Sequence, residues 1–258
     1  MLESRASVRH LSISVLVLSA LALPILASAQ NASMLEISAR PSSLVSPAIV
    51  IGFVGGFIAH NAAAHGGVQL ADRLRKEYPD GVHVEVFENR RGDDAYRQIL
   101  KILDADHDQS LSHDERRNAR IILYGHSWGA CEAIEVARRL ERDGIPVLLT
   151  IQVDSVRKLG EDDSVIPANV AEAANFYQPT GFVRGRPEVR AADPSRTRIV
   201  GNFKFDYTQH PVGCVDSRYP WYARAFEKPH VEIECDPAIS DKMDALIRSA
   251  LPAARTAP

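Results

Sequence analysis

The amino-acid sequence predicts an α/β fold in which a mostly parallel central sheet is flanked by helices on both faces. Two observations lead to this prediction: short apolar runs of the kind found in buried strands, and segments with helical spacing of apolar residues between them. Repeated strand–helix–strand units place their strands in parallel and their helices on the two faces. The sequence contains no internal repeat, so one domain over residues 46–258 suffices.

The first half of this domain contains four predicted elements. Residues 48–54 form an apolar run that ends at a Gly-Gly pair, which indicates a buried strand. Residues 68–76 place Leu side chains at helical spacing among charged residues. Residues 82–87 alternate and are rich in β-branched residues, so we expect a second strand there. Residues 94–103 collect their large apolar side chains on one helical face.

The second half of the domain continues this alternation. Residues 120–124 predict a third strand, and small and apolar side chains at helical spacing predict a helix over residues 127–142. The same signals predict the later elements: strands at 146–153 and 197–205, a short extended piece at 231–234 and a closing helix at 239–251.

Composition and charge exclude several classes of protein. The 258 residues carry 30 Lys and Arg against 33 Asp and Glu, which gives a formal net charge of −3. Because this balance provides no basic field for a polyanion, we expect no nucleic-acid partner. Three cysteines are too few for a fold built on disulfides. A globular domain with a sizeable core remains.

The first 29 residues have the pattern of a secretory signal peptide. A basic start precedes an aliphatic run at residues 13–26, and small residues at 27–29 offer a cleavage site. The aliphatic run is shorter than the ~20 residues that a spanning helix needs. We therefore expect a secreted or periplasmic protein with no stable membrane anchor after cleavage; an uncleaved anchor is the alternative. Residues 30–45 predict a linker.

A nucleophile motif follows the third predicted strand. Gly125-His126-Ser127-Trp128-Gly129 has the form G-x-S-x-G, and it lies between a strand and a helix, which is the context that the motif requires. The two glycines allow the chain to turn sharply, so that the hydroxyl of Ser127 stands clear of the sheet. The alternative is an ordinary Gly-rich turn.

With this motif in this context, the sequence from about residue 46 to residue 251 resembles the α/β-hydrolase superfamily, and in particular its thioesterase and lipase branches. The resemblance implies a catalytic triad in the chain order Ser, acid, His. Two histidines lie far enough downstream to serve as the base. His230 lies before the closing helix, where the family places its histidine, and His210, in a predicted loop, is the alternative.

Two aspartates are candidates for the acid of the triad. Asp154 ends the strand that follows the motif helix, and it resembles the acid of the thioesterase branch. Asp206 follows the next predicted strand, where many other members of the superfamily carry the acid. Either residue could instead cap a loop. The resemblance also implies an oxyanion hole, formed by the backbone N–H of Trp128 and by that of Gly56 or Phe57.

An acidic loop at residues 104–115 has the ligand spacing of an EF-hand calcium loop. Its candidate ligands are Asp104, Asp106, Asp108, Ser110, Ser112 and Glu115. Position 6 of such a loop is Gln109 where glycine is usual, and little helix follows the loop. We expect a structural calcium ion, and no cofactor for catalysis; a solvated acidic loop is the alternative.

The cysteines and one long connection complete the predicted site. Cys214 and Cys235 flank the His230 region, so a disulfide between them could hold it; we expect Cys131 to be buried. In the superfamily, inserts after the acid often cover the site, which implies a cap over residues 155–195; the alternative is a connecting helix at 168–175.

The sequence therefore predicts an exported serine hydrolase that cleaves a carboxylic ester, of a lipid or a small molecule, through an acyl-serine intermediate. The alternative is a secreted calcium-binding interaction protein on a hydrolase scaffold without activity.

Overall fold

A computed structural model describes residues 47–216 and 218–251, and all of them belong to one compact unit, residues 43–258. The expected signal peptide (1–29) and linker (30–45) lie outside the described residues. Among the described residues, no helix has the length and apolar character that crossing a membrane would require.

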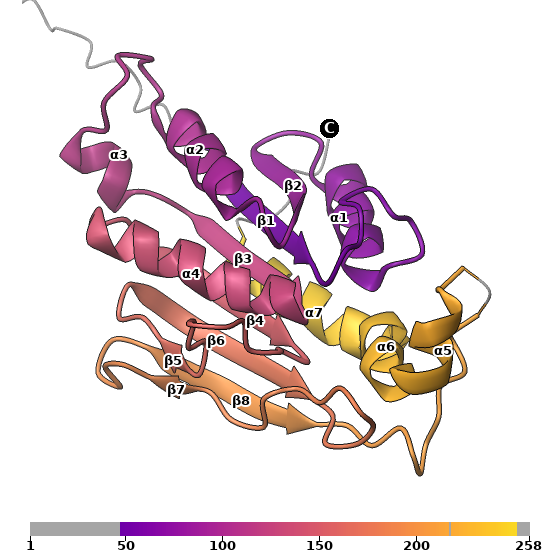
Figure 1. The fold of residues 1–258 in the computed structure, drawn as a ribbon. Coiled ribbons are helices and arrows are strands. Elements are labelled where there is room, and N and C mark those ends of the chain that lie inside the picture. The colour runs from indigo at the N-terminus through magenta and orange to yellow at the C-terminus, as the bar shows by residue number, and fades with distance from the viewer. Residues whose placement is uncertain (1–46, 217, 252–258) are drawn as a thin grey trace, which may run out of the picture. The chain divides into compact units, whose positions relative to one another are not determined.

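A parallel sheet of six strands forms the centre of this unit (Figure 1). Its strands, in spatial order, are β2 (Val82–Glu88), β1 (Ala48–Val54), β3 (Ile121–His126), β4 (Val147–Val153), β6 (Val170–Tyr177) and β8 (Arg198–Lys204). Two further strands, β5 (Val165–Ile166) and β7 (Arg190–Ala191), pair with each other in parallel beside it.

Helices cover both faces of the sheet because successive strand residues point to opposite sides. On one face, α1 (Gly66–Glu77) and α7 (Pro237–Ala250) pack on the side chains of Val50 and Ile122. On the other face, α2 (Gly92–Leu103) and α4 (Trp128–Arg142) pack on Ile51 and Leu123. The remaining helices are α3 (His113–Arg117), α5 (Trp221–Phe226) and α6 (Lys228–Cys235).

This architecture confirms the predicted fold class, an all-parallel sheet between helices that matches the α/β-hydrolase fold. One strand was missed. Residues 170–175 of the segment 168–175, for which a connecting helix was the alternative, instead belong to β6, which lies between β4 and β8. Its alanines have high helix propensity, but the segment is buried between two parallel strands, and this tertiary context outweighs the intrinsic preference.

The predicted extended piece at 231–234 is also wrong, because these residues belong to α6. The alternation of β-branched and acidic side chains resembles a half-exposed strand. In the structure all four of these side chains are buried, and each glutamate finds hydrogen-bond partners there. The alternation of side chains at 231–234 therefore does not separate buried residues from exposed ones.

The strand order fixes where a site can form. The chain runs from β1 outward to β2 and then returns to place β3 on the other side of β1. In such sheets the loops after the two strands at the reversal separate and leave a crevice at the carboxyl edge. The loop after β1 contains Gly56 and Phe57, and the turn after β3 contains Ser127.

Close packing of the turn after β3 against β1 depends on Gly129. A Cβ atom at this position would lie 2.3 Å from the carbonyl oxygen of Phe53 and 2.8 Å from that of Val54. Both neighbours are backbone atoms of a central strand, which cannot move aside without disturbing the sheet. The second glycine of the motif thus holds α4 close to β1.

We expect Gly129→Ala to destabilise the fold by about 1–3 kcal/mol, because the added methyl overpacks a backbone contact. Gly67→Ala is the matched control: it too lies in the first turn of a helix, and its Cβ would make an ordinary 3.5 Å contact with Tyr124. Urea denaturation of both variants measures the difference. Equal stability of the two variants would contradict this account of Gly129.

Candidate active site

Ser127 stands at a strained turn between β3 and α4. Its backbone has φ 57° and ψ −126°, a conformation that non-glycine residues rarely adopt. Its N–H donates to the carbonyl of Val153, and its own carbonyl accepts from Val156. Gly55 approaches from the β1 loop so closely that a Cβ there would lie 2.7 Å from the Cβ of Ser127. The strained backbone is therefore held from two sides.

His230 reaches the same edge of the sheet from α6, and Asp154 reaches it from the end of β4. The Nδ1 atom of His230 lies 2.6 Å from Oδ2 of Asp154, and both side chains are buried. An ionised aspartate only accepts hydrogen bonds, so Nδ1 carries the proton and Nε2 is the free nitrogen of the ring. The pair fixes both the tautomer and the orientation of the imidazole.

Asp154 is fully buried, and each of its carboxylate oxygens has a donor from Gln178. The backbone N–H of Gln178 donates to Oδ1 at 2.9 Å, and its side-chain amide donates to Oδ2 at 2.8 Å. These bonds compensate the loss of hydration that a buried carboxylate suffers. Gln178, which follows the missed strand β6, is therefore a supporting residue that the sequence interpretation did not assign.

The two alternative residues lie elsewhere. Asp206 accepts hydrogen bonds from Thr208 and Gln209, which lower the pKa of its carboxyl, and it caps a turn. His210 is exposed in the following loop, where its N–H donates to the carbonyl of Asp206. Of the predicted alternatives, the structure brings only Asp154 and His230 together.

Ser127 and His230 both line a cavity of about 370 Å³ at the carboxyl edge of the sheet. Phe57 and Trp128 form part of its wall, and their rings meet edge to face with centroids 6.0 Å apart. Val156 and Val183, from the predicted cap segment 155–195, also line it. That segment thus contributes to the wall, although its central part is strand β6.

The three residues predicted as backbone donors of an oxyanion hole, Trp128, Gly56 and Phe57, also line this cavity. Trp128 is the first residue of α4, and the N–H groups of a first helical turn have no intrahelical acceptor. In the β1 loop, the carbonyl of Gly55 accepts from Ile58 and that of Gly56 accepts from the side chain of Asn89. Within the described chain, no acceptor contacts the N–H of Gly56 or of Phe57.

A second buried polar cluster lies beside His230. Nδ1 of His65 lies 2.8 Å from Oε2 of Glu234, and Nδ1 of His126 lies 3.6 Å from the same oxygen. Nε2 of His126 contacts the carbonyl oxygen of His230 at 3.0 Å, and the two rings are 4.5 Å apart. All four side chains line the cavity.

The pKa values of two groups in this cluster, His126 and Glu234, differ from their ordinary values. Burial lowers the pKa of His126 to about 4, so its ring is neutral at pH 7. Burial acts to raise the pKa of Glu234, but the neighbouring imidazoles, His126 and His65 foremost, outweigh it, and the pKa lies below its usual value. No sequence signal links these residues, because 169 positions separate His65 from Glu234.

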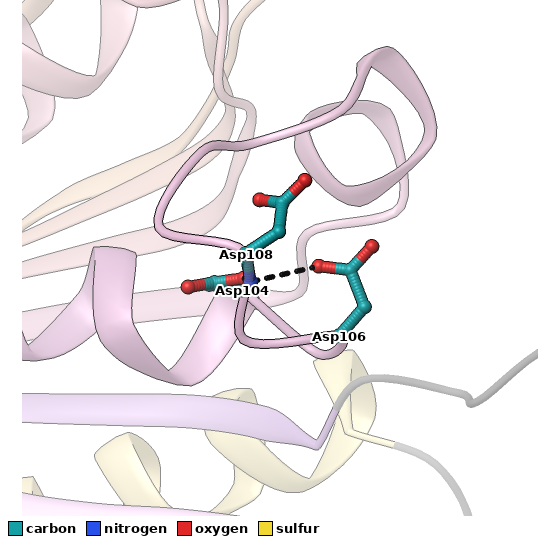
Figure 2. Close-up of side chains that lie close together, drawn as sticks. All are labelled: Asp104, Asp106 and Asp108. Carbon is teal, nitrogen blue, oxygen red and sulfur yellow. Dashed lines mark hydrogen bonds between the residues drawn. The ribbon is translucent and has the colours of Figure 1, made fainter.

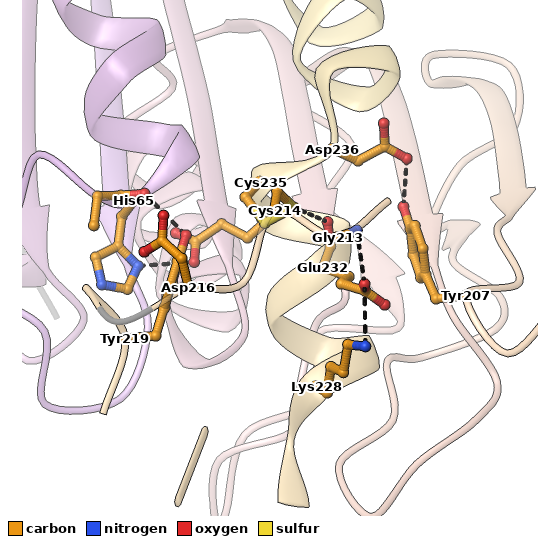
Figure 3. Close-up of a disulfide and its surroundings, with 12 residues drawn as sticks. His65, Tyr207, Gly213, Cys214, Asp216, Tyr219, Lys228, Glu232, Cys235 and Asp236 are labelled. Carbon is orange, nitrogen blue, oxygen red and sulfur yellow. Dashed lines mark hydrogen bonds and ion pairs between the residues drawn. A yellow bond between two sulfur atoms is a disulfide. The ribbon is translucent and has the colours of Figure 1, made fainter. Parts of the chain in front are cut away.

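The predicted disulfide joins Cys214 to Cys235, the last residue of α6 (Figure 3). It ties the loop after β8 to the helix that carries His230, five residues before the bridge. Closing a loop of 21 residues stabilises the fold by about 3 kcal/mol in the chain-entropy account. Cys131 is free and buried, as expected.

The acidic loop gathers three of its six predicted ligands. One carboxylate oxygen from each of Asp104, Asp106 and Asp108 lies within 4.8 Å of the others (Figure 2). Glu115 instead accepts from the N–H of Ala105 and closes a capping box with Ser112 at the start of α3.

The loop also contains two residues in the left-handed backbone region, His107 and Gln109. Gln109 is the residue at which the sequence departs from the usual glycine, and its φ of 70° is the conformation that glycine would adopt more readily. The backbone at position 109 therefore has the left-handed conformation of a tight loop, although the residue there is glutamine and not glycine.

Comparisons with known proteins find likeness only in structure. No protein-family model and no curated protein matches the sequence. The chain is similar to the RedJ thioesterase of the prodiginine pathway in Streptomyces coelicolor, at 12% identity over 80% of this chain and 91% of that chain, with a TM-score of 0.39. It is similar to a thermostable esterase from Pseudomonas putida (11% identity, 84% and 78% coverage, TM-score 0.43). A cutinase-like protein from Cryptococcus sp. matches at 13% identity (81% and 96% coverage, TM-score 0.42).

If Asp154 is the acid that orients His230, Asp154→Asn lowers kcat for ester hydrolysis by about 10³–10⁴-fold, because the amide favours the wrong imidazole tautomer. Asp206→Asn, the matched control, leaves kcat within about twofold, since Asp206 only caps a turn. Steady-state kinetics with a soluble ester measure both values. The reverse ranking of the two variants would assign the acid to Asp206.

Proposed function

We propose that the protein is a serine hydrolase that cleaves carboxylic esters through an acyl-Ser127 intermediate. The observation that carries the proposal is the 2.6 Å contact between His230 and Asp154, beside a serine held in a strained turn on the same cavity. A nucleophile, a base and a residue that orients the base are the components that such catalysis requires.

In the proposed reaction, the Oγ of Ser127 attacks the acyl carbon while Nε2 of His230 accepts its proton. Asp154 holds the opposite side of the ring and stabilises the imidazolium that forms. The developing negative charge on the acyl oxygen is met by the N–H of Trp128 and by that of Gly56 or Phe57. His230 then protonates the leaving alcohol, and a water molecule hydrolyses the acyl-enzyme by the same steps.

The apolar side chains in the wall of the cavity support an ester of a lipid or a small molecule as substrate. Every strongly exposed large apolar side chain in the described ranges lies in a segment that follows the carboxyl end of a strand: Phe57 after β1, Leu159 after β4, Phe182 after β6, and Val212, Trp221, Tyr222 and Phe226 after β8. Of these side chains, Phe57 and Tyr222 line the cavity itself. An inactive interaction protein, the alternative, would have no need of the buried Asp154–His230 pair.

Steady-state hydrolysis of p-nitrophenyl esters of graded chain length tests the activity. We expect saturable turnover by the wild-type protein and a loss of at least about 10³-fold in kcat for Ser127→Ala, because the acyl-enzyme cannot form. The folded variant should keep the circular dichroism of the parent. Turnover that survives in Ser127→Ala would refute the assignment of the nucleophile.

For the acidic loop we propose a structural calcium ion held by Asp104, Asp106 and Asp108. The support is the convergence of three carboxylates, a hard-oxygen set of the kind that calcium prefers. The loop joins α2 to α3, and α3 leads into β3, so an ion there would brace the strand that carries Ser127. Export to a calcium-rich, oxidising compartment, as proposed from residues 1–29, is consistent with the Cys214–Cys235 disulfide.

Millimolar calcium should raise the melting temperature by about 2–4 °C, because an ion that binds only the folded state stabilises it. Asp104→Ala should abolish the increase, whereas Asp80→Ala, an exposed carboxylate elsewhere, should retain it. Scanning calorimetry with and without chelator provides the measurement. An increase of the same size in Asp104→Ala would rule out this loop as the site.

A further inference from the structure

Two acidic side chains line the cavity that contains Ser127, and histidine is the only basic residue type among its described lining residues. Glu227 and Glu234 both line it, and of the residues that the structure describes, no Lys or Arg does. Glu227 is half-buried between α5 and α6, and no ion pair contacts it in the described ranges. Among the described residues that line the cavity, only His65, His126 and His230 can carry a positive charge.

Glu234 is the deeper of the two carboxylates. Its side chain is 3% exposed, and its Oε1 atom is buried without a hydrogen-bond partner among the described residues. Its other oxygen, Oε2, lies 2.8 Å from Nδ1 of His65, and the ring of His126, which is 3.6 Å from the same oxygen, is neutral at pH 7. The buried Oε1 atom is the part of this carboxylate that a cation or a further donor could still contact.

The rest of the wall is aromatic and aliphatic. Trp128, Tyr219 and Tyr222 line the cavity together with Phe57, and Val231 and Ile58 extend the apolar surface. Tyr219 packs against the His65 ring with centroids 5.2 Å apart, next to the disulfide segment (Figure 3). Aromatic faces attract organic cations, and this attraction increases when the site is desolvated.

We propose that the ester cleaved in this cavity carries an alkylammonium group, which the aromatic wall and the carboxylates of Glu227 and Glu234 recognise. The inference rests on the proposed function and specifies its substrate class. An anionic acyl or alcohol group would meet only repulsion from these carboxylates. A metal ion would require several oxygens around one point, and the only such group among the described residues is Asp104, Asp106 and Asp108.

A pair of matched esters tests the recognition of charge. Acetylcholine and 3,3-dimethylbutyl acetate have the same shape and differ in one positive charge. We expect wild-type kcat/KM to be at least about tenfold higher for acetylcholine, since a carboxylate in a partly desolvated site attracts an ammonium strongly. Glu227→Gln and Tyr222→Leu should each lower this ratio, by about three- to tenfold.

Glu188→Gln is the control, because Glu188 is an exposed carboxylate outside the cavity and its substitution changes the net charge equally. It should leave the ratio at the wild-type value. A wild-type ratio near one, with both esters hydrolysed, would overturn the inference and leave the proposed function intact.

A binding measurement separates the two proposals. Trp128 lies in the cavity wall, so tetramethylammonium chloride should quench the tryptophan fluorescence of Ser127→Ala protein saturably, relative to sodium chloride at equal ionic strength. Glu234→Gln, if folded by circular dichroism, and Glu227→Gln should each weaken this binding by about tenfold. Binding without hydrolysis would support the inference and refute the proposed function. No saturable binding, together with a ratio near one, would refute the inference.

Discussion

The hydrogen bond between His230 and Asp154 joins two parts of the chain on which the whole site depends. Asp154 follows a central strand, and His230 lies 76 residues later on a helix that packs against α1, α5 and α7. The contact works because Gln178 donates two hydrogen bonds to the buried carboxylate, and because the Cys214–Cys235 bridge ties down the end of that helix. Without the helix in this position, the proposed nucleophile Ser127 would lack the base proposed for it.

The sheet topology supplies the other half of the site. The reversal of strand order beside β1 opens a crevice, and the turns after β1 and β3 meet there. Gly55 and Gly129 let these turns approach to backbone contact, which holds Ser127 in its strained conformation. The cavity then takes its chemical character from the later segments, since α5 and α6 contribute aromatic rings and two carboxylates.

Features written in a local pattern could be predicted from the sequence, and features that depend on distant contacts could not. The strands at 48–54 and 146–153 could be predicted because each is a continuous apolar run. The motif around Ser127 could be predicted because two glycines at fixed spacing flank the serine. Strand β6 was missed because its alanines carry no strand signal, and α6 was misjudged because its glutamates are buried. His65, His126 and Glu234 meet only in three dimensions, so nothing in their local sequence marks them as a cluster.

The proposed function requires Ser127 to be a nucleophile that His230 and Asp154 activate. The most direct measurement is the intact mass of the protein after exposure to a fluorophosphonate probe, followed by peptide mapping. A single adduct on Ser127, absent in Ser127→Ala and strongly slowed in Asp154→Asn, is the expected result. Folded wild-type protein that gains no adduct, or gains it on another serine, would contradict the account.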